Sequence, residues 1–224
     1  TISMILVLQY FFGLWVTFVM RKVNRNALAV LSYVFLYGCI SSQPNDIDNI
    51  CSMFEEKRNW YSSAQSAEKR WGIPIAVNMA VIYQESSFKA RARPNRSKIL
   101  WVLPGRRPSS AYGYAQALDS TWNDYKKFSG NKNASRNNFS DAIDFVGWYN
   151  SNSRRINSID YFDAKNFYLA YHEGNSGFAR QSYREKQWLI NAANRVQRNS
   201  EIFSSQLKNC ENELSKGWLW RLLS

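Results

Sequence analysis

The sequence has few of the residues that build metal sites. It contains one histidine, His172, and three cysteines, Cys39, Cys51 and Cys210, and none of them stands at the spacing of a zinc site. A lone histidine is more often structural than a metal ligand or a base. The sequence therefore indicates no metal site, and we expect no metal or other cofactor.

Acidic residues are also scarce. The chain has 17 Asp and Glu against 29 Lys and Arg, which gives a formal net charge of +12. A surface of this sign attracts nucleic acid, anionic lipid or an acidic polymer, or is simply a soluble surface biased towards cations. No helix-turn-helix, zinc-finger spacing or aromatic RNA-binding signature accompanies the arginines, so nucleic acid is not an expected partner.

Internal repeats and low-complexity segments are absent as well. Of the 224 residues, 45% are hydrophobic and 16% are aromatic. This is enough apolar material for one compact domain with a substantial core, and the length leaves little room for a second domain.

The beginning of the chain has the layout of an export signal. From Met20, cationic residues precede an apolar run over residues 27–38, and Cys39 follows. The run is too short for a stable membrane anchor and matches the apolar region of a secretory signal. Its end resembles a bacterial lipobox, so we predict a signal peptide over residues 20–38 and lipid attachment at Cys39.

Residues 1–19 form a second apolar run, which we interpret as a leader upstream of a true start at Met20. The alternative is a transmembrane helix over residues 2–19, whose length is marginally sufficient to span a bilayer. Lipidation would place the protein in the periplasm, and Ile40 after the cysteine favours the outer membrane.

Export also bears on the other two cysteines. With Cys39 lipidated, Cys51 and Cys210 are an even pair in an oxidising compartment, which favours a disulfide. Such a bond would tie the first mature helix to the last and would contribute about 4–5 kcal/mol in the chain-entropy model. Two buried thiols are the alternative.

The mature chain divides into a tether, one domain and a tail. We predict a polar tether over residues 39–50, which would hold the domain close to the membrane. The domain is expected over residues 51–214, and a C-terminal tail over residues 215–224.

Apolar residues recur at helical spacing through the predicted domain. The first helix is capped by Asp48 or Asn49 and runs to about Arg70, where Trp71 and Gly72 end it. Further helices are predicted over residues 120–128, 141–149, 160 or 163 to 171, and 183–214, and a long loop or small hairpin with a short strand at 99–103 is predicted over residues 89–111.

The stretch over residues 71–94 is the most informative. Pro74 opens a helix that is apolar on nearly every face and must therefore be buried. Its far end turns polar at Glu85, where partial desolvation would raise the pKa of the carboxyl group, as a general acid requires. An ordinary solvated glutamate at a frayed helix end is the alternative.

Three short motifs follow one another along the chain. They are residues 85–88 (ESSF), 111–116 (AYGYAQ) and 170–174 (AYHEG). In this order they resemble the signatures of the lytic transglycosylase (SLT) domain, and the mature chain resembles the bacterial lipoprotein members of that family. The resemblance implies a lysozyme-like fold: a single helical domain, mainly α (α+β), with a small loop or hairpin beside the active-site cleft.

The resemblance also implies residue roles. Glu85 is the expected catalytic residue, first as the acid that protonates the leaving oxygen and then as the base while the muramic acid 6-hydroxyl closes an anhydro ring. The structural alternatives are a turn-capping amide for Gln116, a core tyrosine for Tyr171 and a structural acid for Glu173. The residues expected to bind substrate are Ser86, Tyr114, Gln116, Tyr171 and Glu173.

The prediction is thus an exported, lipid-anchored lytic transglycosylase that cleaves the MurNAc–GlcNAc bond of peptidoglycan and forms 1,6-anhydro-muramic acid. Its expected partners are peptidoglycan glycan strands, the membrane through a lipid anchor, and a cell-envelope secretion or division complex. One alternative is a lysozyme-type muramidase that hydrolyses the same bond. The other is a non-catalytic wall-binding module of a secretion or division apparatus.

Overall fold

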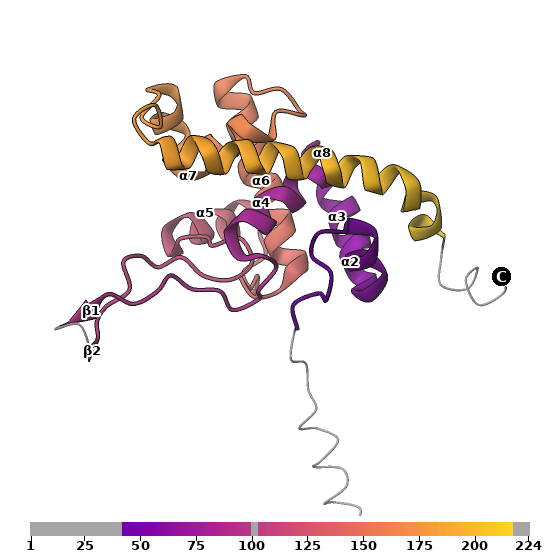
Figure 1. Cartoon of the computed structure of the whole chain (residues 1–224), viewed down its shortest axis with the longest axis horizontal. Helices are drawn as coiled ribbons and strands as arrows, with labels where there is room; N and C mark the ends of the chain where they lie inside the picture. Colours follow the sequence, from indigo (N-terminus) through magenta and orange to yellow (C-terminus); the bar gives the residue numbers. More distant parts are fainter. Residues whose placement is uncertain (1–41, 100–102, 217–224) are drawn as a thin grey trace, which may run out of the picture. The chain divides into compact units, whose positions relative to one another are not determined.

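The computed structural model describes residues 42–99 and 103–216. Within these residues the chain forms seven helices and one small β-hairpin (Figure 1). This confirms the expected mainly α fold of one helical domain with a hairpin. The helices are α2 (Ile50–Glu56), α3 (Arg58–Trp71), α4 (Ile75–Ser86), α5 (Asp119–Ser129), α6 (Phe139–Asn157), α7 (Ala164–Ala179) and α8 (Gln187–Ser215), and the strands are β1 (Lys98–Ile99) and β2 (Leu103–Pro104).

Several predictions for the two ends of the chain lie outside the described residues. They are the leader over residues 1–19, the signal peptide over residues 20–38, lipidation at Cys39, and the outer parts of the tether and tail. Among the described helices, none has both the length and the apolar character needed to cross a bilayer.

Helix α4 lies at the centre of the helical domain and packs against α3, α6, α7 and α8. Every residue from Ile75 to Ile82 is buried, as expected for a helix that is apolar on nearly all faces. Burial of each large side chain on this helix contributes about 1.5–3 kcal/mol. This burial fixes the helix axis, and with it the place where Glu85 leaves the core.

A buried pair of asparagines links α4 to α6. The Asn150 side-chain amide donates to Asn78 Oδ1 at 3.1 Å, and the Asn78 amide donates to the backbone oxygen of Ile73 at 3.3 Å. Both side chains are fully buried, so each hydrogen bond offsets the cost of removing a polar group from water. The pair fixes the rotation of α4 about its axis.

The first predicted helix is in fact two helices. Asn49 caps α2 through hydrogen bonds from the backbone N–H groups of Cys51 and Ser52, but the helical conformation breaks at Lys57, with φ −107° and ψ 69°. The break turns the chain so that residues on both sides of Lys57 reach the core. Helix α6 also differs from its prediction, because it runs well beyond residues 141–149 at both ends.

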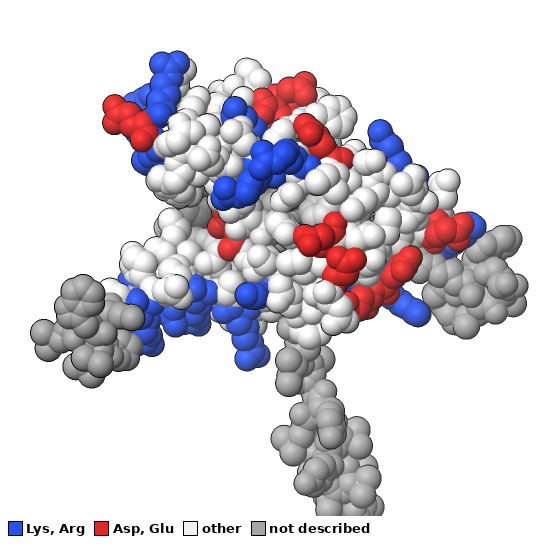
Figure 2. All heavy atoms as spheres, in the orientation of Figure 1, with Lys and Arg blue, Asp and Glu red and all other residues white. Residues whose placement is uncertain are grey.

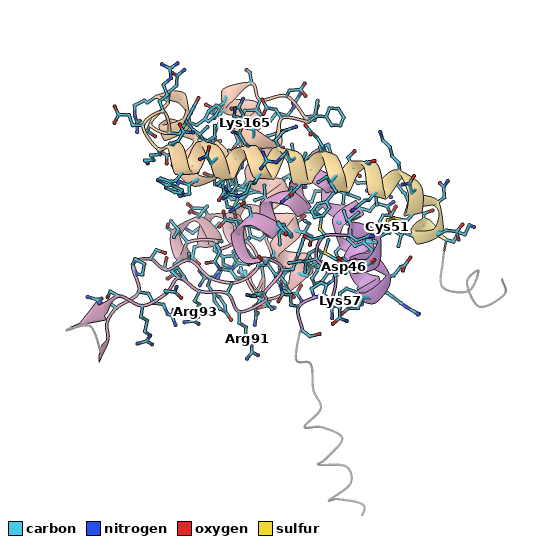
Figure 3. The ribbon with its side chains drawn as sticks, in the orientation of Figure 1. Asp46, Cys51, Lys57, Arg91, Arg93 and Lys165 are labelled. Atoms are coloured by element: carbon cyan, nitrogen blue, oxygen red, sulfur yellow. A yellow bond between two sulfur atoms is a disulfide. The ribbon has the colours of Figure 1, made fainter. Side chains whose placement is uncertain are left out.

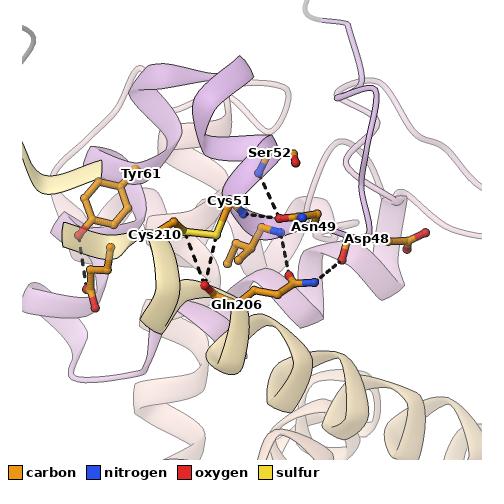
Figure 4. The surroundings of a disulfide bond; sticks show 9 residues. Asp48, Asn49, Cys51, Ser52, Tyr61, Gln206 and Cys210 are labelled. Atoms are coloured by element: carbon orange, nitrogen blue, oxygen red, sulfur yellow. Dashed lines mark hydrogen bonds between the residues drawn. A yellow bond between two sulfur atoms is a disulfide. The ribbon is translucent and has the colours of Figure 1, made fainter. Parts of the chain in front are cut away.

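A disulfide joins α2 to α8 through Cys51 and Cys210 (Figure 4). Beside it, Gln206 on α8 accepts a hydrogen bond from the backbone N–H of Ile50 at 3.0 Å and donates to the backbone oxygen of Asp48 at 3.1 Å. Tyr61 on α3 also donates to Glu211 on α8, at 3.4 Å. Helix α8 is therefore held to the first helices by one covalent bond and several polar contacts.

Strands β1 and β2 pair in antiparallel fashion at the tip of an extended segment, which Figure 1 shows lying beyond the helices. The pairing joins Lys98 to Pro104 and Ile99 to Leu103, so the expected small hairpin is present, with two short strands in place of the single strand predicted over residues 99–103. Residues 100–102 lie outside the described residues. We call residues 89–107 the basic arm.

Candidate active site

Glu85 lies in the last turn of α4, where the buried helix reaches the surface. The helix ends at Ser87 and Phe88, which both have positive φ values, 49° and 60°. The Glu85 side chain is partly buried and accepts a hydrogen bond from the hydroxyl group of Tyr168. Burial raises the pKa of Glu85 to about 7, although the hydrogen bond from Tyr168 acts to lower it.

Helix α7 carries two tyrosines that face this carboxyl group. Tyr168 and Tyr171 are three residues apart and so lie on the same face of the helix. The Tyr171 hydroxyl donates to the backbone oxygen of Ala115 at 2.6 Å. Burial, and next the charge of Glu85, raises the pKa of both hydroxyl groups, so both remain protonated donors.

The turn that receives Tyr171 depends on a glycine. Gly113 has φ +79°, and a Cβ atom at this position would lie 2.0 Å from the backbone oxygen of Arg136. That same oxygen accepts a hydrogen bond from the N–H of Tyr114 at 3.1 Å. Only glycine fits this conformation and this close approach.

Gln116 joins the same turn to the segment that follows Glu85. Its side-chain amide donates to the backbone oxygens of Ala92 at 2.9 Å and of Gly113 at 2.8 Å. Both N–H groups are therefore used, and the side chain is partly exposed. The carbonyl oxygen of the amide has no hydrogen-bond partner in the described part of the chain and can accept a hydrogen bond from a ligand.

Two of the residues expected to bind substrate are buried. The Tyr114 ring is 1% exposed and packs edge-on against Trp60 and Phe139, with ring centroids 5.7 Å apart in each pair. The Ser86 hydroxyl is turned back onto its own helix, where it donates to the backbone oxygen of Ile82 at 3.2 Å. The Tyr114 ring is part of the core, and the Ser86 hydroxyl is hydrogen-bonded within its own helix. In this structure neither side chain is therefore placed to contact a ligand.

Glu173 is held in a polar cluster that joins α7 to the start of α8. Lys186 donates to its two carboxylate oxygens at 2.8 and 2.9 Å, and Ser182 also donates to it. His172 Nδ1 lies 3.1 Å from Glu173 Oε1. Burial acts to raise the pKa of Glu173, but the hydrogen bonds from Lys186, Ser182 and His172 lower it to about 2. The arrangement is that of an ionised structural acid.

The structure thus brings together Glu85, Tyr171 and the turn that contains Gln116. It adds Tyr168, which the motifs did not single out. The available signal was its spacing, because a tyrosine three residues before Tyr171 must share its helix face. Within residues 42–99 and 103–216, no group of three or more His, Cys, Asp or Glu is placed to hold a metal ion.

The site lies where the surface is open to solvent. The side chains of Glu85, Gln116 and Tyr171 are each partly exposed. A carboxyl group with a pKa near neutrality, two protonated tyrosines and a free amide oxygen can together bind a hydroxylated ligand and exchange a proton with it.

The family model described as the transglycosylase SLT domain matches residues 27–210 of the chain. No curated protein matches the sequence.

Proposed function

The chain belongs to the transglycosylase SLT domain family, and we propose that it is a lytic transglycosylase that cleaves the MurNAc–GlcNAc bond of peptidoglycan. The observation that carries this proposal is the environment of Glu85. The carboxyl group is partly buried, has a pKa of about 7, and lies beside the tyrosines of α7. Near neutral pH it is therefore present in both the protonated and the ionised form, and the reaction needs each in turn.

In the first step, protonated Glu85 gives its proton to the glycosidic oxygen as the bond to the muramic acid carbon breaks. Positive charge develops on the sugar ring, and the Glu85 carboxylate formed in this step lies close enough to stabilise it. In the second step, the carboxylate takes the proton of the muramic acid 6-hydroxyl group. The oxygen of that hydroxyl then bonds to the same carbon and forms the 1,6-anhydro ring, which restores protonated Glu85.

The other residues of the site have distinct roles in this proposal. Tyr168 holds the Glu85 carboxyl group in place through its hydrogen bond. Tyr171 positions the turn of Gln116 through its bond to Ala115, and the free amide oxygen of Gln116 binds a sugar hydroxyl. Ser86, Tyr114 and Glu173 act indirectly, because each is committed to packing or to hydrogen bonds within the protein.

A lysozyme-type muramidase is the first alternative. Hydrolysis by that route uses a second carboxylate, either to activate water or to form a covalent intermediate. Among the described residues, no second carboxylate shifts the pKa of Glu85. This favours the route that needs one carboxylate.

Mass spectrometry of the released muropeptides tests the proposal. We expect products lighter by one water than those of hydrolysis, and we expect Glu85→Gln to lower their release by at least about 100-fold. Products of hydrolytic mass would establish the muramidase. Unchanged digestion by Glu85→Gln would refute the catalytic role of Glu85, and binding without any release by the natural protein would leave only the non-catalytic wall-binding module.

The location of the protein is part of the proposal. The family acts on the cell wall, and the Cys51–Cys210 disulfide is typical of proteins that fold in an oxidising compartment. Both support a periplasmic protein. We further propose a signal peptide over residues 20–38, lipidation at Cys39 and attachment to the outer membrane, with residues 39–50 as the tether and residues 51–214 as the catalytic domain. Radiolabelled palmitate incorporation, compared between the natural protein and Cys39→Ala, tests the anchor.

A further inference from the structure

The basic arm contains an unusual concentration of charge. Residues 86–118 include seven Lys and Arg and no Asp or Glu, in a chain whose net charge is +12. All seven lie in the arm, so an excess equal to more than half of the net charge comes from this one short segment. Figure 2 shows Lys and Arg side chains grouped along the arm and its base, with no acidic side chain among them on this face.

Four arginines of the arm face solvent. Arg91, Arg93, Arg96 and Arg106 are exposed. Among the ion pairs in the described part of the chain, none involves an arm residue. Figure 3 shows Arg91 and Arg93 projecting from the arm on the same side. These charges repel one another and are not compensated within the domain, which favours an anionic partner.

The arm begins at Lys89, four residues after Glu85. Arg91 is six residues after Glu85, so their Cα atoms are at most about 20 Å apart. Between Arg91 and Arg93, the backbone oxygen of Ala92 accepts hydrogen bonds from the N–H of Gly113 at 3.0 Å and the side chain of Gln116 at 2.9 Å. Two arginines thus flank the residue that anchors the Gln116 turn.

One arginine is also held in place by an aromatic ring. The Arg93 guanidinium lies over the ring of Tyr112, 4.5 Å from its centroid. Tyr112 in turn pairs with Ala117 across the turn that contains Gln116. A guanidinium stacked in this way keeps its edge N–H groups free, and these form paired hydrogen bonds with a carboxylate.

We infer that the basic arm binds the carboxylates of the peptide stems that peptidoglycan carries on its muramic acid residues. The inference rests on the proposed function. Each stem is attached to the sugar whose bond is cut, so a strand bound at Glu85 brings its stems close to the segment from which the arm extends. The arm then selects strands that still carry peptides over strands that have lost them.

An anionic bilayer is the other partner of matching charge. The stems are favoured because the segment that carries Arg91 and Arg93 also supplies Ala92, whose backbone oxygen anchors the Gln116 turn of the candidate site. The experiment must therefore distinguish stems from lipid head groups, and it must remain informative if the protein does not cleave peptidoglycan.

Cosedimentation with insoluble cell-wall sacculi meets both needs. We would compare sacculi with intact stems against sacculi from which an amidase has removed the stems, using the full chain with Glu85→Gln so that nothing is cut. The variant Arg91→Glu/Arg96→Glu/Arg106→Glu should bind intact sacculi about tenfold more weakly at low salt, as expected for the loss of three exposed ion pairs. Binding to sacculi without stems should not change.

A matched control lies on α5. A pocket of about 370 Å³ there is lined by Asn123, Lys126, Lys127, Gly130 and Lys132. The variant Lys126→Glu/Lys127→Glu/Lys132→Glu changes the net charge by the same amount as the arm variant. It should bind both kinds of sacculi as the parent does.

Three results would overturn the inference. Equal loss of binding to both kinds of sacculi would show that the arm does not recognise stems. A loss of binding confined to phosphatidylglycerol vesicles would assign the arm to the membrane. Equal effects of the arm variant and the α5 variant would show that binding depends on the net charge of the protein and not on the arm itself. A failure of the proposed function would instead appear when the natural protein, with Glu85 in place, leaves peptidoglycan undigested while the stem-dependent binding remains intact.

Discussion

Tyr168 on α7 donates a hydrogen bond to Glu85 on α4, so the candidate acid and the residue that orients it come from helices more than 80 residues apart. The bond stabilises the ionised form of the carboxyl group, whereas burial stabilises the protonated form. The pKa of about 7 is the balance of these two effects.

The variant Tyr168→Phe should shift this balance. Without the hydrogen bond the pKa of Glu85 rises further, so the limb of the pH–rate profile that reports this group should move to higher pH. At neutral pH the rate should fall because the carboxyl group is less firmly held. The profile of kcat/KM between pH 5 and pH 9 measures the shift. Tyr149→Phe is the control, since the Tyr149 hydroxyl bonds to the backbone oxygen of Ala170 and should leave the profile unmoved.

Stability should depend on pH through the same group. Because burial raises the pKa of Glu85 from 4.5 to about 7, the folded state holds a proton that the unfolded state has lost between these values, and stability falls as pH rises through this range. Glu85→Gln cannot ionise and escapes this loss. It should match the natural protein near pH 4 and exceed it at pH 8 by up to about 3 kcal/mol. Chemical denaturation at both pH values tests this, and equal stability at pH 8 would contradict the raised pKa.

Gly113→Ala should distort the turn that holds Gln116. The new Cβ atom would lie 2.0 Å from the backbone oxygen of Arg136, so the turn must move and activity should fall at least tenfold. Gly130→Ala provides a matched control, because Gly130 also has positive φ, +73°, but has nothing within 4 Å of the added atom. Both variants carry the conformational strain, and only the first carries the clash. Equal activity in the two would refute the role assigned to the turn.

Removal of the disulfide should lower the free energy of unfolding by about 4–5 kcal/mol, the value for a closed loop of this length in the chain-entropy model. The bond joins positions 159 residues apart. Urea denaturation of Cys51→Ala/Cys210→Ala and of the oxidised natural protein measures the difference. The hydrogen bonds of Gln206 remain in the variant, so α8 should still pack against α2. A difference below about 1 kcal/mol would contradict the model.

The parts of the fold that could be predicted are those for which local pattern and burial agree. The run from Ile75 to Ile82 can be buried only as a central helix, and it is one. The break at Lys57 could not be predicted, because apolar residues continue at helical spacing across it and only tertiary packing selects the turn. The burial of the Tyr114 ring could not be predicted for a related reason: its motif marks the turn, but packing in the core decides which side of the turn the ring occupies.

The disulfide also determines what happens when the domain is cut. Positions 51 and 210 enclose the whole of the candidate site, including the exposed basic arm. A protease that clips the arm therefore opens the backbone but releases nothing, because the bond still joins the two pieces. Clipped protein should migrate as one species on a non-reducing gel and as two after reduction, so the arm can be cut without separating Glu85 from the helix that carries Tyr168.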